Sequence, residues 1–594
     1  GPAPMPISSA LATLALLFPQ DHAVAHPVPA LPGAAQATSV APLGALEILA
    51  INTPGHPANV VPTLGLPYAP GGGSGSAFGR PYLSPNGSFW LIEARVHTGT
   101  GQDELYLFNG FLFLVEGQPA PWSLDPVEEI GPLDERVAVN NSGSVVITNN
   151  TTNGATDDEY VVLFPTPSAP QVVAREGQPL DPALGLDPGA AWDFVLDTPV
   201  ITNSGLAGWR ASSVDGLSGG DELFVLGDQV LLQTDVTVPQ GQASGGASTV
   251  EAIDANDVFI SPSGQSWLAQ ADLNGSPASD DVVLLDLRVV VQEQSLLPAS
   301  PFVQPVDLNG IDQVRMDEAG TWFARGNNTD EQDWLLRNAE VVAFSNGGNE
   351  VVPGSGETWS DQEFGPCFFA FDGNVAGEYV IGGTTDADPA TNGVLVFDNG
   401  RGYRQVLCRE GELVDLDGNG LFDDDRFINS FGTDDVALDP DGAVWLVATL
   451  KTAAGEAVDQ GLFRIAPCEG YLGYGLDASP FNTLLLIGQG STSLGSLARL
   501  EVSNLPDPGA ASLILSTGPA VFPLFETVGL VDPVGFIGAP LLAFAVGGVA
   551  NFQLPVPGNP SFVGLELFLQ AGAAVPSAPS GISLSNGLRL TICP

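Results

Sequence analysis

Histidine and lysine are nearly missing from this chain of 594 residues. Its four histidines all lie before residue 98, and Lys451 is the only lysine. A Ser-His-Asp triad or a multi-histidine zinc site would therefore have to be built at the N-terminal edge of the chain. The composition argues against imidazole-based catalysis, and we expect a protein that is not an enzyme.

Positive charge is scarce as well. The chain has 17 Lys and Arg residues against 69 Asp and Glu residues, a formal net charge of −52. Binding to nucleic acid or to anionic membrane surfaces needs Lys and Arg, so the charge excludes both kinds of partner. Hydrophobic residues make up 44% of the chain and charged residues only 14%. This composition predicts a folded core beneath a surface of solvated carboxylates.

Long apolar runs are missing too. Residues 7–18 (ISSALATLALLF) form an apolar stretch of twelve residues, well short of the ~20 that span a bilayer as a helix. A later run, Val534 to Ala550, is interrupted by glycines and a proline. The sequence therefore predicts no transmembrane helix.

The N-terminal stretch, residues 1–43, is an extended tail rich in Pro and Ala with two open interpretations. Its apolar run followed by Ala23-Val24-Ala25 is typical of a secretory signal and its cleavage site, yet no Lys or Arg precedes Arg80. Alternatively, the run is a β-prone segment that adds as a strand to a neighbouring subunit. The apolar residues of such an assembly strand are Ile7, Leu11, Leu14, Leu16 and Phe18.

Cysteines are few and even in number, which favours disulfides. Their spacing suggests the pairs Cys367–Cys408 and Cys468–Cys593, although four cysteines allow three pairings. Four buried thiols are the alternative. Disulfides would imply an oxidising compartment, so we expect an extracellular or cell-surface location.

A seven-fold repeat is the strongest positive signal in the sequence. Each unit has a polar turn that ends in glycine and leads into an apolar strand, and then a polar residue that leads into a second apolar strand. The turn glycines are Gly87, Gly143, Gly205, Gly264, Gly320, Gly377 and Gly442, and the second markers are Asp103, Asp158, Asp221, Asp281, Asp333, Asn392 and Gln460. No helix-length amphipathic run interrupts the pattern.

Units of three or four short strands separated by turns are typical of propeller blades. We therefore predict an all-β chain with a seven-bladed β-propeller over residues 44–466, closed when the strand at 45–52 joins the last unit. The recurring acids should cap strands, because a catalytic acid would break the repeat. The tryptophans after the turns should be packing residues: Trp90, Trp209, Trp267, Trp322 and Trp445.

From Cys468 onward the repeat stops. Short alternating segments such as TLLLIG and ASLILS are separated by Pro and Gly turns, a pattern that predicts a small β-sandwich over residues 467–594. Few polar groups in it could converge on a substrate.

Two parts of the chain resemble known proteins. The repeat units at residues 45–466 resemble those of secreted bacterial β-propeller surface proteins, and the stretch from Phe562 to Cys593 resembles terminal β-domains of secreted bacterial surface proteins. The resemblance implies display or assembly more than chemistry. Propellers host hydrolases, lyases, lectins and scaffolds alike, so fold alone assigns no function.

One acidic loop predicts a structural calcium site. Asp415, Asp417 and Asn419 stand at positions 1, 3 and 5 of an EF-hand-type pattern, and the carbonyl of Leu421 could converge on the same cation. Position 12 is Arg426 instead of Glu. The shell would then be completed by Asp423, Asp424 or Asp425. A solvated acidic turn is the alternative.

These features favour a non-enzymatic extracellular structural protein, a fibre subunit joined through its N-terminal strand to the β-sandwich of another copy. One alternative is a monomeric propeller that binds an extracellular glycan or a peptide. Another is a glycosidase or lyase that uses two carboxylates, for which 69 acidic residues offer too many candidates to single out a pair.

Overall fold

The computed structural model describes residues 46–593 apart from short internal segments. The chain divides into two compact units, Ala45–Pro467 (the N-terminal unit) and Cys468–Pro594 (the C-terminal unit). Within the described residues, the one regular element that is not a strand is the 3-10 helix η1 (Pro182–Leu184), and no helix is long and apolar enough to cross a membrane. The internal segments outside the description are 71–75, 97–102, 134–136, 153–157, 194–195, 244–245, 298–300, 318, 353–354, 361–365, 401–403, 418–422, 468–470, 475–481, 490–491, 493–496, 525–526, 558–561 and 563–564.

The first three larger sheets of the N-terminal unit are antiparallel and follow one another along the chain. Besides them, a short pair joins β11 (Ala191–Trp192) to β14 (Val214–Asp215). The first sheet holds β2 (Phe78–Leu83), β3 (Trp90–Arg95), β4 (Glu104–Phe108) and β5 (Phe111–Val115); the second holds β6 (Glu129–Ile130), β7 (Val137–Val139), β8 (Val145–Thr152), β9 (Glu159–Phe164) and β10 (Gln171–Arg175); the third holds β12 (Leu196–Ile201), β13 (Ala207–Ala211), β15 (Leu223–Leu226) and β16 (Gln229–Gln233).

Four further four-stranded sheets complete this unit. The fourth holds β17 (Val250–Ile260), β18 (Trp267–Leu273), β19 (Asp281–Leu285) and β20 (Arg288–Gln292); the fifth holds β21 (Val306–Met316), β22 (Trp322–Asn328), β23 (Asp333–Arg337) and β24 (Glu340–Phe344); the sixth holds β25 (Phe368–Gly373), β26 (Tyr379–Thr384), β27 (Gly393–Asp398) and β28 (Arg404–Arg409); the seventh holds β29 (Phe427–Leu438), β30 (Val444–Lys451), β31 (Ala457–Ile465) and β1 (Leu46–Ile51).

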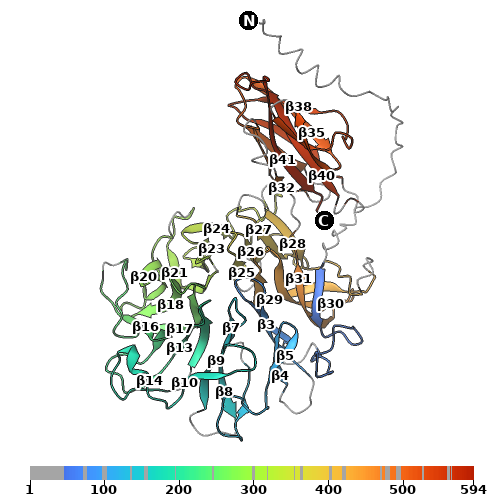
Figure 1. The fold of residues 1–594 in the computed structure, drawn as a ribbon. Coiled ribbons are helices and arrows are strands. Elements are labelled where there is room, and N and C mark those ends of the chain that lie inside the picture. The colour runs from blue at the N-terminus through green and yellow to red at the C-terminus, as the bar shows by residue number, and fades with distance from the viewer. Residues whose placement is uncertain are drawn as a thin grey trace. The chain divides into compact units, whose positions relative to one another are not determined.

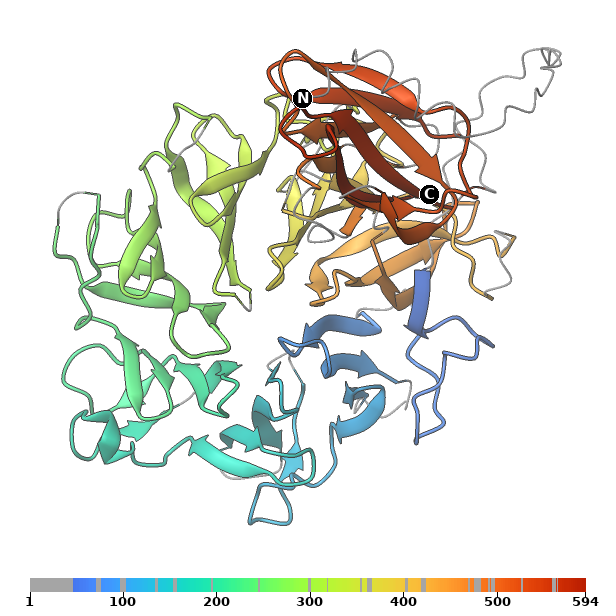
Figure 2. The same ribbon diagram turned by 45° about the horizontal axis from the view of Figure 1, so that its top comes forward.

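The seven sheets follow one another around a common centre (Figure 2). The inner strands contact one another in sequence, β2 with β7, then β12, β17, β21, β25 and β29, and β29 returns to β2. As predicted, the strand at the start of the chain joins the last sheet, because β1 pairs antiparallel with β31 from Leu46↔Ile465 to Ile51↔Gly461. This pairing covers the outer edge of β31 with β1, the first strand of the described residues. The unit is therefore a closed, propeller-like ring.

The repeated turns explain why the inner hairpins form. All seven turn glycines have positive φ, between 66° and 85°, which residues with a Cβ rarely adopt. The residue three positions earlier is polar and buried, and its side chain holds the turn. In the second sheet, for example, Asn140 Oδ1 accepts hydrogen bonds from the backbone N–H groups of Ser142 and Ser144 at 3.0 Å each. Its Nδ2 donates to Thr202 O of the next sheet at 3.0 Å, so the same side chain joins neighbouring sheets.

The repeat tryptophans pack as predicted. Trp209, Trp267, Trp322 and Trp445 are buried, and Trp90 lies with its ring centre 5.4 Å from that of Trp445. The Trp90–Trp445 contact joins the first sheet to the seventh. These side chains hold sheets together and leave no exposed stacking platform.

The first predicted disulfide is wrong. Cys367 and Cys408 are both buried thiols, and the Cys367 thiol donates to Thr384 O at 3.3 Å. Cys367 directly precedes β25 and Cys408 lies on β28, at opposite ends of the order β25-β26-β27-β28. Strands three positions apart are separated by roughly 14 Å, about twice the ~7 Å between Cα atoms that a disulfide tolerates. Cys468 lies outside the described residues, so the pairing of Cys468 with Cys593 stays a prediction.

The C-terminal unit contains two larger sheets, of which Figure 1 labels the five-stranded one. The two sheets share one hydrophobic core. Buried polar side chains add to the core, and Asn586 exchanges hydrogen bonds with the backbone of Leu486 at 2.8 and 3.0 Å. The five-stranded sheet has the order β32 (Tyr471–Tyr474), β41 (Ile582–Thr591), β40 (Glu566–Ala574), β35 (Gly509–Ser516) and β38 (Leu541–Ala545); the three-stranded sheet has β33 (Leu485–Gln489), β34 (Leu497–Ser503) and β39 (Ala550–Pro555); a hairpin pairs β36 (Pro519–Leu524) with β37 (Thr527–Val531).

Candidate binding site in the central channel

A cavity of about 590 Å³ lies at the centre of the ring. All seven inner strands contribute to its wall, which explains why no short stretch of sequence contains the site. One lining residue from each strand, in chain order, is Arg80, Val139, Thr198, Asp257, Asp312, Asp372 and Asp434. Cavities of about 300–1,000 Å³ are the usual size of small-molecule sites.

The wall is polar on one side and mostly apolar on the other. The second and third sheets contribute Val137 to Val139 and Pro199 to Ile201, whereas the fourth to seventh sheets contribute most of the charges. The charged lining residues are three arginines (Arg80, Arg315 and Arg325) and six aspartates (Asp257, Asp312, Asp317, Asp372, Asp434 and Asp435). The channel therefore carries more carboxylates than cations.

Arg315 ties three inner strands together. Its Nε lies 3.0 Å from Asp372 Oδ1, and its Nη1 donates to Phe371 O and Val436 O at 3.2 Å each. Burial and the nearby Arg80 lower the pKa of Arg315 to about 10, which leaves it charged at neutral pH. Asp372 in turn accepts from the Leu438 amide at 2.8 Å. This ion pair is part of the ring's framework.

Asp257 and Asp312 face the same cavity without such a partner. Among the described residues neither forms an ion pair with an arginine, although Asp257 Oδ1 accepts from the Val314 amide at 3.1 Å. Burial, with smaller contributions from neighbouring carboxylates, raises the pKa of Asp257 to about 7. Asp312 is open to the channel, and the desolvation caused by the surrounding walls raises its pKa. Both carboxyls would be stabilised in their charged form by a cation.

Asp317 is an unusual member of the turn series. Its Oδ1 accepts from the amides of Ala319 and Thr321 at 2.8 Å each, as Asn140 and Asn374 do in their turns. Asp317 lines the channel, and its Oδ2 is buried and has no hydrogen-bond partner among the described residues. Burial raises the pKa of this carboxyl to about 6. At the equivalent turn position, two other sheets have asparagine, whose Nδ2 donates a hydrogen bond to the next sheet.

The repeat acids have a structural role. Asp333 Oδ2 accepts from the Cys367 amide of the next sheet at 2.6 Å, as predicted for a capping acid. In the first three sheets the glutamate directly after the predicted aspartate accepts a hydrogen bond from a backbone amide of the next sheet. The pairs are Glu104 with Leu133, Glu159 with Leu196 and Glu222 with Ile253, at 2.7–2.8 Å. Asp281 accepts from Gln270, which also donates to Ile311 O of the next sheet. These groups join successive sheets and are not candidates for ligand binding.

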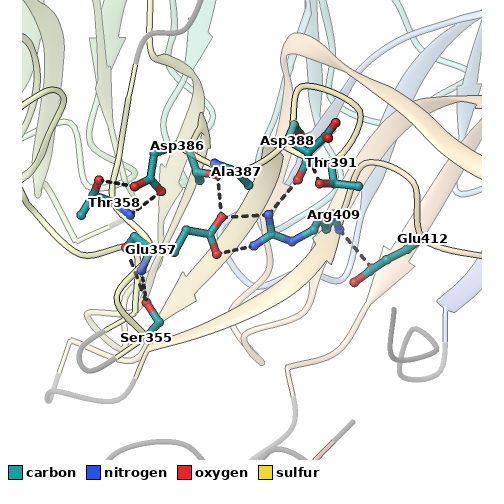
Figure 3. Close-up of polar contacts among 10 residues, drawn as sticks. Ser355, Glu357, Thr358, Asp386, Ala387, Asp388, Thr391, Arg409 and Glu412 are labelled. Atoms are coloured by element: carbon teal, nitrogen blue, oxygen red, sulfur yellow. Dashed lines mark hydrogen bonds and ion pairs between the residues drawn. The ribbon is translucent and has the colours of Figure 1, made fainter. Parts of the chain in front are cut away.

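Another polar cluster, on the sixth sheet, is also structural (Figure 3). Arg409 donates to both carboxylate oxygens of Glu357, at 2.8 and 2.7 Å, and to Thr391 O at 2.7 Å. Glu412 accepts from the Arg409 amide at 3.0 Å, and burial raises its pKa to about 8. Because these groups bond one another, the cluster holds the segment around Glu357 against β28.

The acidic loop brings together part of the predicted metal site. Oxygen atoms of Asp415, Asp417 and Asp424 all lie within 4.8 Å of one another, close enough to share one cation. Asp424 Oδ2 accepts from the Leu416 amide at 2.7 Å, so the loop itself positions this carboxylate. Asp425 instead accepts from the Ala453 amide at 2.9 Å. Of the other predicted ligands, Asn419 and Leu421 lie outside the described residues, and Asp423 is not in the cluster.

The predicted assembly strand, with Ile7, Leu11, Leu14, Leu16 and Phe18, lies outside the described residues. Sequence reasoning missed the channel, although a signal was present. Seven or eight residues before a turn glycine stand Arg80, Asp257, Asp312, Asp434 and Asp435. Each repeat turn is preceded by an inner strand, so extending the repeat to include the residues before the turn would have placed these charges on the inner strands.

No family model and no curated protein matches this chain. Among solved structures, it is similar to PorZ of Porphyromonas gingivalis, described as an essential bacterial surface component of the type-IX secretion system, with 12% identity over 87% of this chain and 70% of that one and a TM-score of 0.21. It is also similar to BBS1N, solved in complex with ARL6DN, with 10% identity over 60% of this chain and 98% of that one and a TM-score of 0.19.

Proposed function

We propose that this chain is a non-enzymatic extracellular binding protein, a seven-bladed β-propeller whose central channel holds a cationic group of a peptide ligand, followed by a β-sandwich. The observation that carries the proposal is the excess of aspartates over arginines in a cavity that all seven inner strands enclose. The sheet order and the closing strand β1 support seven blades. The shared core of the two C-terminal sheets supports a sandwich.

The chemistry of the channel favours a lysine or arginine side chain as the group bound. A cation near Asp257 and Asp312 would interact with two carboxyls that form no ion pair with an arginine among the described residues, although Arg325 is near enough to lower the pKa of both. The apolar side of the cavity, formed by the second and third sheets, suits the aliphatic parts of a peptide. Carboxylates that lose water on binding interact more strongly with a cation than exposed ones do.

Calorimetric titration with a short lysine-containing peptide tests this proposal. We expect saturable binding that strengthens from pH 6 to pH 8, because Asp257 ionises near pH 7. The double variant Asp257→Asn, Asp312→Asn should weaken binding by about tenfold or more, on the order of 1.4 kcal/mol. The control is Asp228→Asn, at an exposed turn position, which should bind as the unchanged protein does. Absence of saturable binding, or equal binding by all variants, would refute the proposal.

A carboxylate-based glycosidase or lyase is the second candidate. A carboxyl with a pKa near 7 beside another acid in a cavity is what a general acid needs, and Asp257 meets this description. Formation of new reducing ends in a panel of glycans, abolished by Asp257→Asn, would favour the enzyme over the binding protein.

A further inference from the structure

The C-terminal unit exposes an apolar edge strand. β38 ends the five-stranded sheet, and on the side away from β35 no strand pairs with it among the described residues. Alternate side chains along and just after the strand are large, apolar and exposed: Leu542 by 67%, Phe544 by 84% and Val546 by 82%. Proteins normally protect such edges with charges, prolines or covering segments. Along β38 itself an edge without a partner strand lies beside the hydrophobic stripe, whereas Val546, just after the strand, exchanges backbone hydrogen bonds with Val549.

Charge is also missing around this strand. Residues 533–565 contain no Asp, Glu, Lys or Arg, although the whole chain has a net charge of −52. Two copies of so acidic a protein repel each other over most of their surfaces. A contact at this edge avoids placing carboxylates opposite each other, so a charge-free partner segment suits it best.

The chain itself supplies a segment of this kind. Residues 1–20 are free of charge, and residues 7–18 lie between Pro6 and Pro19 without an internal proline or glycine. From residue 10 to residue 18 only Thr13 is polar, so a strand formed here would present an apolar face in either register. From Phe18 to the start of β1 at Leu46 the chain could extend up to about 90 Å, enough to reach another copy.

We propose that residues 7–18 of one copy add as a strand to the exposed edge of β38 in a second copy, so that copies join head to tail. The added strand would pair with the backbone edge of β38, and its apolar face would cover Leu542, Phe544 and Val546. Donor and acceptor are different surfaces, so the contact is heterologous and produces open filaments unless a ring closes. This assembly is separate from ligand binding in the channel.

Sedimentation and electron microscopy of the full chain test this inference. We expect concentration-dependent filaments that are lost when residues 1–20 are removed, and equally lost in Leu542→Lys, Phe544→Lys, because charged edges oppose strand addition. Leu124→Lys, at a fully exposed leucine of the N-terminal unit, is the control and should still assemble. Circular dichroism should report unchanged folding in each variant, since the substituted side chains are exposed.

Cysteine cross-linking identifies the occupant of the edge. Mixing Leu14→Cys protein with Phe544→Cys protein should give an intermolecular disulfide between the two positions. A cross-link only between two copies of Phe544→Cys would mean that β38 pairs with itself, and would overturn the proposal. Monomers at all concentrations, or a mature protein whose intact mass lacks residues 7–18, would overturn it too. Peptide binding to the channel is scored separately, so either proposal can fail alone.

Discussion

The two units of this protein use charge in opposite ways. The N-terminal unit carries 61 acidic and 15 basic residues, whereas the C-terminal unit carries seven and two. In the ring, charged groups connect sheets, as Arg315 does with Asp372 and Glu104 with the Leu133 amide. In the C-terminal unit, neutral side chains such as Asn586 and Gln570 make the buried polar contacts.

The contrast indicates how the sequence of each unit specifies one arrangement of its sheets. Seven similar sheets could pair in more than one order, and directional polar bonds between neighbours favour the observed one. The C-terminal sheets are fewer and share one apolar core, which specifies their packing without ions. The C-terminal unit exposes an apolar edge at β38, whereas the surface of the ring is acidic and solvated.

The largest effect should come from deleting a core side chain of the ring. Trp334 is completely buried between sheets, so Trp334→Ala should cost about 3–5 kcal/mol. In calorimetry we expect it to lower the unfolding transition of the N-terminal unit and leave that of the C-terminal unit in place. Phe552→Ala, in the C-terminal core, should do the reverse. A single transition shifted by both variants would contradict the separation of the units.

An intermediate effect is expected at the turn of the fifth sheet. The pKa of Asp317 is raised from 3.8 to about 6, so its protonated form favours the folded state, and stability falls as pH rises from about 4 to about 6. Asp317→Asn removes this loss and supplies a donor like that of Asn374, which bonds to Asp439 O at 3.0 Å. At pH 7 we expect a gain of up to about 3 kcal/mol in urea unfolding.

The matched control is the same substitution in the seventh turn. Asp439 Oδ2 lies 2.9 Å from Arg464 Nη2, so Asp439→Asn should destabilise the protein. If Asp317→Asn also destabilises at pH 7, the carboxylate has a partner that the geometry does not reveal.

The smallest effect concerns calcium at the acidic loop. We expect calcium to raise the melting temperature of the N-terminal unit by a few degrees, because a ligand at 100 times its Kd stabilises by about 2.7 kcal/mol. Asp417→Asn should abolish the shift in melting temperature and Asp423→Asn should keep it, because Asp417 belongs to the cluster and Asp423 does not. A calcium shift in the C-terminal unit would be unexpected, because the cluster lies in the ring.

The sequence predicted those features that repeat locally. Turn glycines require positive φ, so a residue such as Gly377 marks its hairpin directly, and the strand before the first repeat had to pair with the last. Features that depend on distances between strands were not predictable. The pairing of Cys367 with Cys408 ignored the two strands between them, and Asp257 and Asp312 line one cavity only because separate sheets converge on it.

The pairing of β1 with β31 has a consequence for how the protein is made. Its two strands are more than 400 residues apart in the chain, so the ring cannot close until a ribosome has synthesised nearly the whole N-terminal unit. Earlier sheets can form as they emerge, but the first inner strand waits for its neighbour in the seventh sheet. Contacts between segments so far apart in the chain form slowly, and strand edges that will later be paired stay exposed until they form. The pairing of β1 with β31 is therefore expected to be a late step in the folding of the ring.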